Sequence, residues 1–230
     1  MIDIAANYRM ILQGIGAAAA RSGREAGAVR MLAASKSQSM EKVQTAIAAG
    51  IRLFGENYVQ EAAAKKAAAR APVEWHMIGH LQRNKVKAAL DLFDVIESLD
   101  NLGLAQALEK EAAARGRIVR ALVEVNLAGE ENKSGLPQEA LAPLLEAIEA
   151  LPHLRIEGLM AVPPLADDPE KARPYFRALA ELREKFKSQK RSNIELKELS
   201  MGMSHDYAVA IEEGATLVRI GTALFGPRES

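Results

Sequence analysis

The chain has 230 residues, enough to bury a large core in one barrel or sandwich. Thirty Lys and Arg balance thirty Asp and Glu, so no global field favours nucleic acid or an anionic membrane. The absence of cysteine excludes disulfides and thiolate chemistry. No signal peptide is recognisable, and no segment approaches the roughly 20 apolar residues of a membrane span. We therefore expect a cytoplasmic protein with one domain over residues 1–230.

Short apolar or β-branched runs alternate along the chain with longer stretches of helical period, which indicates repeated βα units. A helix over residues 4–21 precedes the first strand and is expected to pack across one end of the fold. The strands are expected at residues 29–35, 52–55, 74–79, 95–99, 120–127, 155–162, 195–201 and 216–221. Eight parallel strands with crossover helices predict a (β/α)8 barrel of the TIM type.

Helix signals support this pattern. Ser39 is predicted to cap the helix that ends before Gly50, and Pro137 to open the helix after the fifth strand. The Ala-rich segments 61–65 and 111–115 are assigned to outer helices as solvated scaffold, because they are strong helix formers with charged ends. A doubly wound open sheet is the main alternative, but no Gly-rich turn follows the first strand.

The barrel interpretation predicts where function lies. Active sites of such barrels sit at the C-terminal ends of the strands, and the loops after the last two strands often hold phosphate. Three segments fall there, namely Lys36 after strand one, residues 200–204 after strand seven, and residues 219–222 at the end of strand eight. Closure of the barrel is expected to bring them together.

The last two of these segments suit a dianionic phosphate. Gly202 and Gly221 allow close backbone approach and offer N–H donors. Ser200, Ser204 and Thr222 offer hydroxyl groups. We therefore expect a phosphate site here.

Lys36 is expected to meet the other end of the same ligand. An inward lysine costs desolvation energy, so its amine should have a chemical partner. With a reference pKa of about 10.4 it is neutral less than about one time in a thousand at pH 7, so reaction with an aldehyde needs a lowered pKa. Arg219 is a cation that would lower it. Lysine, arginine and a phosphate cradle together point to pyridoxal phosphate held as an internal aldimine.

Six segments resemble, in order and over nearly the whole chain, the pyridoxal phosphate homeostasis proteins, a family related to the N-terminal barrel of alanine racemase. These segments are LAASKS, FGENYVQE, WHMIGHLQRNK, VNLAGEENKSG, EGLMAV and ELSMGMSHDYAVAIEEGATLVRIGTALFG. The chain departs from the family in detail, with MLAAS in place of a valine-rich strand and no threonine and proline in the loop after Lys36.

The resemblance implies a fold-type III barrel with the cofactor on Lys36 and Arg219 facing the pyridine nitrogen. It further implies a cofactor-binding set, without a catalytic residue or a metal ligand, that consists of Lys36, Asn57, Met77, His80, Ser200, Met201, Gly202, Ser204, Arg219, Gly221 and Thr222. The family is described as binding and buffering pyridoxal phosphate, with no established catalytic turnover. PLP-dependent apo-enzymes are the partners that this role implies.

The alternative function is a single-domain amino-acid racemase with Lys36 as its only base. An arginine donor leaves the ring nitrogen unprotonated and the ring a weak electron sink. The chain also ends at Ser230, without the second domain that supplies a tyrosine acid/base and pairs the subunits of racemases. Both points favour a carrier, and the missing domain favours a monomer. A phosphate-sugar enzyme fits less well, since a sugar has no ring nitrogen to face Arg219.

Several residues also have structural interpretations. Arg219 is able to pair with Glu212 or Glu213, and Asn57 to cap the helix that follows it. His76 and His80 lie four apart, which on a strand separates them by roughly 13 Å and excludes one shared metal ion.

The loop over residues 129–135 is a solvated turn in one interpretation and a lid or partner surface in the other. Lys133 within it is a candidate second amine for the aldehyde.

Overall fold

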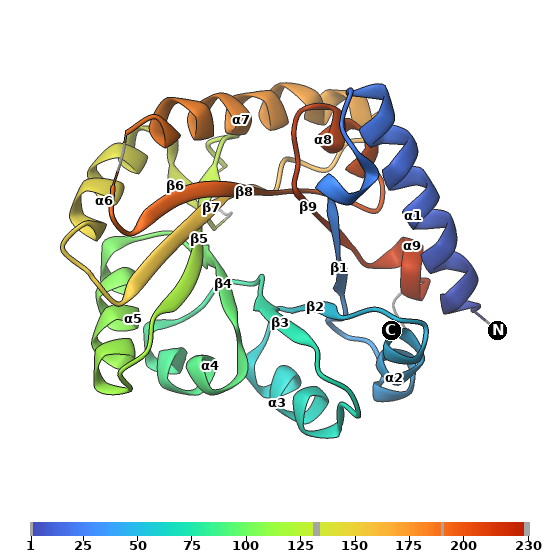
Figure 1. Ribbon diagram of the computed structural model, residues 1–230, viewed down its shortest axis with the longest axis horizontal. Coiled ribbons are helices and arrows are strands. Elements are labelled where there is room, and N and C mark those ends of the chain that lie inside the picture. The colour runs from blue at the N-terminus through green and yellow to red at the C-terminus, as the bar shows by residue number, and fades with distance from the viewer. Residues whose placement is uncertain (1, 131–133, 190, 228–230) are drawn as a thin grey trace.

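The computed structural model describes residues 2–130, 134–189 and 191–227. Eight parallel strands form a closed ring in the order β4, β3, β2, β1, β9, β8, β7, β5, and β5 pairs back with β4. Figure 1 looks along the axis of this ring. The strands are β1 (Arg30–Ala34), β2 (Leu53–Glu56), β3 (Glu74–Met77), β4 (Val95–Leu99), β5 (Val119–Asn126), β7 (Leu154–Met160), β8 (Ile194–Met203) and β9 (Leu217–Ile220). The predicted barrel is confirmed.

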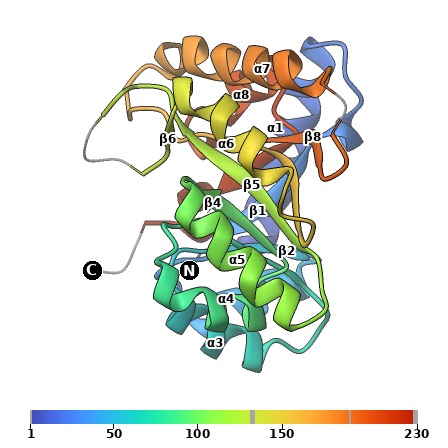
Figure 2. The same ribbon diagram turned by 90° about the vertical axis from the view of Figure 1, so that its left-hand side faces the viewer.

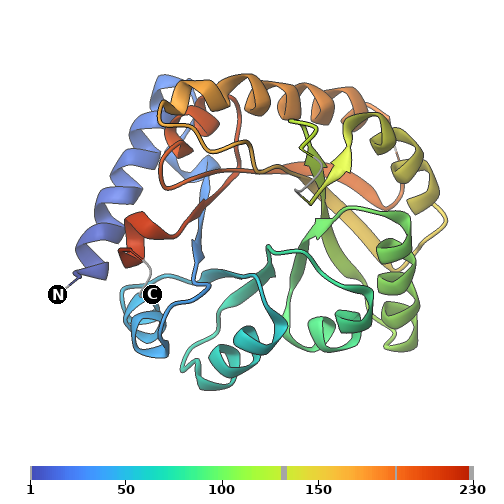
Figure 3. The ribbon, with the colours of Figure 1, turned by 180° about the vertical axis from the view of Figure 1, so that it is seen from behind.

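Helices surround the ring on its outside, as Figures 1 and 3 show from opposite directions. They are α1 (Ile4–Arg21), α2 (Met40–Ala48), α3 (Val59–Ala68), α4 (Val86–Leu92), α5 (Leu102–Ala114), α6 (Leu141–Ile148), α7 (Arg173–Lys187), α8 (Tyr207–Glu212) and α9 (Thr222–Phe225). Short 3-10 turns are η1 (Ala26–Ala28), η2 (Arg83–Lys85), η3 (Gln138–Ala140) and η4 (Pro169–Ala172). Within the described ranges, no helix combines the length and apolarity needed to cross a membrane.

Helix α1 has the predicted bounds but a different place. It lies along the side of the barrel beside α8 and α9 and does not cross an end (Figure 1). Its buried residues, among them Ile4, Ile11 and Ile15, recur at helical spacing and form one stripe. A single apolar stripe is enough to pack against the side wall of the barrel, so the stripe alone does not require a position across one end. The expected position across an end of the barrel was wrong.

Local signals explain the other helices. The Ser39 hydroxyl accepts a hydrogen bond from the amide of Lys42, so the predicted cap of α2 is confirmed. Pro137 precedes η3, which leads directly into α6. The Ala-rich segment 61–65 lies in α3, and residues 111–114 close α5.

Most strand bounds differ from the prediction by one or two residues, and two strands differ in their pairing. β8 continues to Met203, because a shift in its register lets Met203 pair with Arg219 of β9. A short strand, β6 (Leu136–Pro137), also pairs with the end of β5 and was not predicted. Two residues give no period to detect. Figure 2 shows the segment with β6 extending beyond one end of the barrel.

The two faces of the barrel wall have different chemistry. Successive residues of a strand point to opposite faces, so one half of each strand packs against the helices in a large apolar core. The other half faces the barrel interior, where two small apolar clusters lie apart. One contains Leu32, Leu53 and Leu217, and the other contains Val95, Leu122 and Met160. Charged side chains fill much of the remaining interior.

Candidate functional site

Lys36 follows the end of β1 in a tight turn and is half-buried. Leu32 belongs to an interior apolar cluster and Ala34 packs against it, so Lys36 comes at the next position of the same alternation. Ser37 has a φ of 59°, in the left-handed region that residues with a side chain adopt at an energetic cost. The turn therefore carries its lysine in a specific backbone conformation.

Four buried or partly buried side chains stand behind this turn, and we call them the outer cluster: Ser35, Glu56, Glu61 and Lys65. Lys65 Nζ donates to Glu56 Oε1 at 2.8 Å, to Glu61 Oε1 at 2.6 Å and to the carbonyl oxygen of Ser35 at 2.5 Å. Burial raises the pKa of Glu56, although hydrogen bonds from Lys65 and Ser35 oppose this. Lys65 is only 4% exposed, so its assignment to solvated scaffold was wrong.

Arg219 is 5% exposed and points into the barrel from β9. Its Nη1 donates to Ser200 Oγ at 2.6 Å and its Nη2 to the carbonyl oxygen of Ala161 at 2.8 Å. Burial lowers its pKa, and the charges of Glu97 and Glu124 oppose this.

The alternative pairing of Arg219 with Glu212 or Glu213 does not occur. Glu212 pairs with Arg21 and Arg173 on the surface. Glu213 pairs with Arg173 and Arg177.

A hydrogen-bonded series crosses the barrel, and we call it the inner chain: His76, Glu97, Ser200 and Arg219. His76 Nδ1 donates to Glu97 Oε1 at 2.5 Å, and Ser200 Oγ donates to Glu97 Oε2 at 2.5 Å. Since β4 and β8 are not neighbours in the sheet, the Glu97–Ser200 bond must pass through the interior. The hydroxyl of Ser200 thus connects the carboxylate to the guanidinium.

The charges of this chain hold one another in place. Burial lowers the pKa of His76, but its bonds and charge contacts with Glu74 and Glu97 outweigh burial and raise the pKa to about 9. Burial raises the pKa of Glu97, and His76 and Arg219 reverse this, so the net shift is downward. His76 is therefore a buried imidazolium at neutral pH.

Glu124 is a further interior carboxyl close to the inner chain. Burial raises its pKa to about 7, the charge of Asp100 adds to this, and the charge of Arg219 opposes it. The group is therefore partly protonated at neutral pH. It gives the interior a carboxyl that both accepts and donates hydrogen bonds.

The expected phosphate segments meet at the end of β9. Ser204 Oγ accepts hydrogen bonds from the amides of Gly221 and Ala223, both at 3.2 Å. Thr222 follows and is exposed. Gly202 has a φ of 90°, and a Cβ there would lie 2.5 Å from that of Ala210, so this position requires glycine.

The pairing of β1 with β9 brings these groups to the end of β1 that precedes Lys36. Leu32 is in register with Arg219 and Ala33 with Ile220. A Cβ on Gly221 would lie 3.5 Å from the carbonyl oxygen of Ala34. The lysine turn, the arginine and the Ser204–Gly221 contact therefore share one end of the barrel.

Asn57 lies between β2 and α3 and is half-buried. It does not cap α3, because Tyr58 occupies the cap position and makes no side-chain cap bond. The Asn57 Oδ1 atom is buried without a hydrogen-bond partner among the described residues. An unsatisfied buried acceptor is uncommon and marks a position where a ligand donor would fit.

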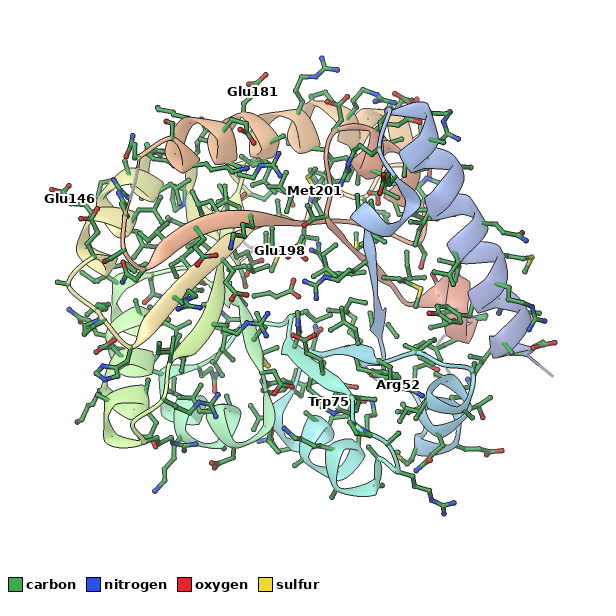
Figure 4. All side chains as sticks on the ribbon, viewed as in Figure 1. Arg52, Trp75, Glu146, Glu181, Glu198 and Met201 are labelled. Carbon is green, nitrogen blue, oxygen red and sulfur yellow. The ribbon has the colours of Figure 1, made fainter. Side chains whose placement is uncertain are left out.

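Three of the expected residues do not join this group. Met77 and Met201 belong to the apolar core on the helix side of the wall, next to His76 and Ser200, which face inward. Figure 4 shows Glu198 on the interior side of β8 and Met201 on the side of the helices. The side chain of His80 is 51% exposed and lies 3.4 Å from Asp100. Alternation along a strand explains the two methionines.

The segment between β5 and β6 borders a groove of about 510 Å³, which Asn126, Leu127 and Gly129 line together with α7 residues Leu182 and Phe186. Neither Lys36 nor Arg219 lines this groove. Lys133 lies outside the described residues, so its expected role has no structural counterpart here. Where side chains are described, no group of three His, Asp or Glu residues is arranged to hold a metal ion.

The donor set fits a small phosphorylated aldehyde. An amine, a buried guanidinium, an unsatisfied amide oxygen and a serine hydroxyl beside backbone N–H groups stand at one end of the barrel. Sequence reasoning missed Glu97 and the outer cluster. A glutamate in the middle of the apolar strand at 95–99 was the available signal for the first. Nothing in the Ala-rich helix signalled the burial of Lys65.

Known proteins resemble this chain over its length. The family described as "Alanine racemase, N-terminal domain" matches residues 4–229. A pyridoxal phosphate homeostasis protein of Aquifex aeolicus is 44% identical over 220 residues, which cover 95% of this chain and 96% of the relative. PipY of Synechococcus elongatus, solved with PLP bound, is 34% identical with a TM-score of 0.85 over 97% of this chain and 100% of PipY.

Alanine racemase of Bartonella henselae shares the fold alone, with 16% identity and a TM-score of 0.72 over 98% of this chain and 58% of the racemase. The closed barrel, the full-length match and the identity to the Aquifex relative agree. The chain therefore belongs to the family of pyridoxal phosphate homeostasis proteins, built on the barrel of the alanine racemase N-terminal domain.

Proposed function

We propose that this protein binds pyridoxal phosphate on Lys36 and takes part in keeping the cell's supply of this cofactor, as a carrier without catalytic turnover of its own. The names of its relatives and the PLP-bound state of PipY support the proposal. The observation that carries it for this chain is the register of β1 and β9, in which Leu32 lies opposite Arg219 and Ala34, two residues before Lys36, lies next to Gly221.

Each residue has a stated task in this proposal. The Lys36 amine adds to the aldehyde carbon, a C=N bond forms, and the aldehyde oxygen leaves as water. Ser204 and the amides near Gly221 hold the phosphate, assisted by the backbone of Gly202 and the hydroxyl of Thr222. The hydroxyl of Ser200 stays between Glu97 and Arg219.

Arg219 faces the ring nitrogen in this proposal, and Asn57 offers its unsatisfied oxygen to the ligand. For Met77, Met201 and His80 the proposal retains no side-chain contact, because two face the helices and one is exposed.

Arg219 also affects the chemistry that the bound cofactor could support. Its guanidinium donates to Ser200 and to the carbonyl of Ala161, so its orientation is fixed. A guanidinium can only donate, and a ring nitrogen that accepts from it stays unprotonated. Bound pyridoxal phosphate is an electron sink, and this contact weakens it, which disfavours carbanion chemistry.

The test uses borohydride, which reduces the C=N bond and fixes the cofactor to its lysine. We expect one equivalent of pyridoxyl group on the peptide containing Lys36, and its loss in Lys36→Ala. Lys197→Ala is the matched control, because Lys197 is an exposed lysine on β8. An adduct that survives in Lys36→Ala with unchanged cofactor affinity contradicts the proposal. Deuterium exchange at Cα of amino acids, lost in Lys36→Ala, would instead establish an enzyme.

The proposal includes a monomeric protein in the cytoplasm that supplies apo-enzymes with PLP. The name that its relatives carry, pyridoxal phosphate homeostasis protein, supports this location. Sedimentation of the purified protein tests the monomer, and transfer of PLP to an added apo-enzyme tests the supply.

A further inference from the structure

The backbone on both sides of Lys36 is held by side chains of one helix, α3. The peptide group before Lys36 ends in the carbonyl oxygen of Ser35, which accepts from Lys65 Nζ at 2.5 Å. The peptide group after it carries the amide of Ser37, which donates to Glu61 Oε1 at 2.6 Å. Both peptide planes that flank the lysine are therefore fixed from outside β1.

Glu61 and Lys65 act as one unit. They stand four residues apart on the same face of α3, and Lys65 Nζ also donates to Glu61 Oε1 at 2.6 Å. A second bond anchors the unit to the barrel, where Lys65 reaches the fully buried Glu56. Glu56 in turn accepts from the hydroxyl of Ser35 at 2.6 Å. Low exposure makes such bonds directional and strong.

The conformation that this unit holds is an unfavourable one. Ser37 is a residue with a side chain in the left-handed region. A backbone hydrogen bond from the Gln38 amide to the Ser35 carbonyl oxygen at 3.1 Å closes the turn, and the carboxylate of Glu61 adds the one bond that the structure describes for the Ser37 amide. The direction of the Cα–Cβ bond of Lys36 depends on that turn.

We propose that Glu61 and Lys65 are positioning residues that aim Lys36 into the barrel mouth by fixing the peptide groups on either side of it. The inference rests on the proposed function of Lys36. Its consequence is a faster reaction with the aldehyde, because an amine held in the attacking geometry loses little freedom on reacting. Phosphate and ring contacts do not depend on this turn.

The experiment compares two ligands in the full-length protein freed of cofactor. PLP carries the aldehyde, and pyridoxine 5′-phosphate has the same ring and phosphate with an alcohol in its place. In Glu61→Ala we expect the rate of borohydride-trappable adduct on Lys36 to fall about tenfold or more, the size expected for a hydrogen bond to a charged group. Affinity for pyridoxine 5′-phosphate should stay as in the wild type.

Three variants complete the design. Glu61→Gln keeps an oxygen acceptor for the Ser37 amide and should restore most of the rate. Glu61→Asp keeps the negative charge on α3 but shortens the side chain by one methylene, so the carboxylate no longer reaches the Ser37 amide. Adduct formation on Lys36 should therefore be slow in Glu61→Asp, and this variant serves as the test if Glu61→Ala does not fold. Glu111→Ala removes the similar pair of Glu111 with Arg115 on α5 and should react like the wild type.

Each outcome decides between the possibilities. Unchanged adduct formation in both Glu61→Ala and Glu61→Asp overturns the positioning role. An equal loss for both ligands also overturns it, since that result indicates general damage to the site. A wild-type protein that forms no adduct on Lys36 contradicts the proposed function itself, and this is seen before any variant is made.

Discussion

The outer cluster and the inner chain are both buried networks of charge, yet they are built differently. The outer cluster joins Ser35, which follows β1, to Lys65 of α3, the helix that follows β2. The inner chain joins His76 to Arg219 across the barrel. The first fixes a backbone turn and the second fixes a guanidinium. In the proposed site, the two ends would be held by separate networks, one on each side of the barrel wall.

Solvent access also separates the two. Glu56 and Glu97 are both fully buried, but the outer cluster also contains Glu61, whose side chain is 25% exposed, whereas every member of the inner chain is at most 5% exposed. Removing one partner of a buried pair is most costly where water cannot replace it. The inner chain should therefore respond more strongly to substitution.

The largest expected effect is that of Glu97→Ala. It leaves the buried imidazolium of His76 with only the partly exposed Glu74, and it removes the Glu97 charge from the buried Arg219. We therefore expect the free energy of unfolding in urea to fall by about 3–5 kcal/mol. Ser98→Ala is the control, because the buried Ser98 hydroxyl has no partner among the described residues and its loss should be nearly neutral. A loss below about 1 kcal/mol for Glu97→Ala would mean that the inner chain adds little stability.

The pH dependence of stability should report His76. Its pKa rises from 6.5 to about 9 on folding, so its stabilising contribution is complete below pH 6.5 and is lost as the pH rises through 9. The shift corresponds to about 3 kcal/mol. The pKa of Glu74 is lowered to about 2 by the same ion pair with His76, so it does not represent a further contribution to the unfolding free energy.

The measurement is the change in unfolding free energy between about pH 6 and about pH 10, in the wild type and in His76→Gln. We expect the change to be about 3 kcal/mol smaller in the variant. Identical pH profiles would assign the alkaline loss to other groups.

A smaller effect is expected from Lys65→Met in the outer cluster. The change should lower the unfolding free energy by about 1–3 kcal/mol, because water still reaches Glu61 and Glu56 is able to take up a proton. Burial already raises the pKa of Glu56, so the loss should shrink as the pH falls. Lys66→Met is the control, since Lys66 Nζ donates to the carbonyl oxygen of Leu92. A loss as large as that of Glu97→Ala would contradict the difference between the clusters.

Much of the fold was predictable from local patterns. The bounds of α1 and β4 and the cap of α2 at Ser39 follow from apolar period and capping chemistry, which act over a few residues. The strands β8 and β6 were harder, since a register shift and a two-residue pairing depend on the neighbouring strand. The position of α1 on the barrel was not predictable from its sequence, because one apolar stripe fits either the side or an end of the barrel.

Some residues of the candidate site were likewise predictable from local patterns, and others were not. Lys36, Arg219, Ser204 and Gly221 were predicted from strand ends, and the structure brings them to one end of the barrel. The inclusion of Met77 among the ligand contacts came from resemblance alone, and its strand alternation turns it toward the helices.

The sequence by itself determined the barrel class, the eight strands, the surrounding helices and the lysine at the end of β1. These depend on periodicity and on chemistry within short segments. Only the tertiary structure decided which charges are buried together. Lys65 lies in an Ala-rich helix of ordinary appearance, and Glu97 meets Ser200 from across the barrel. Burial depends on which elements pack against each other, and local spacing does not specify that.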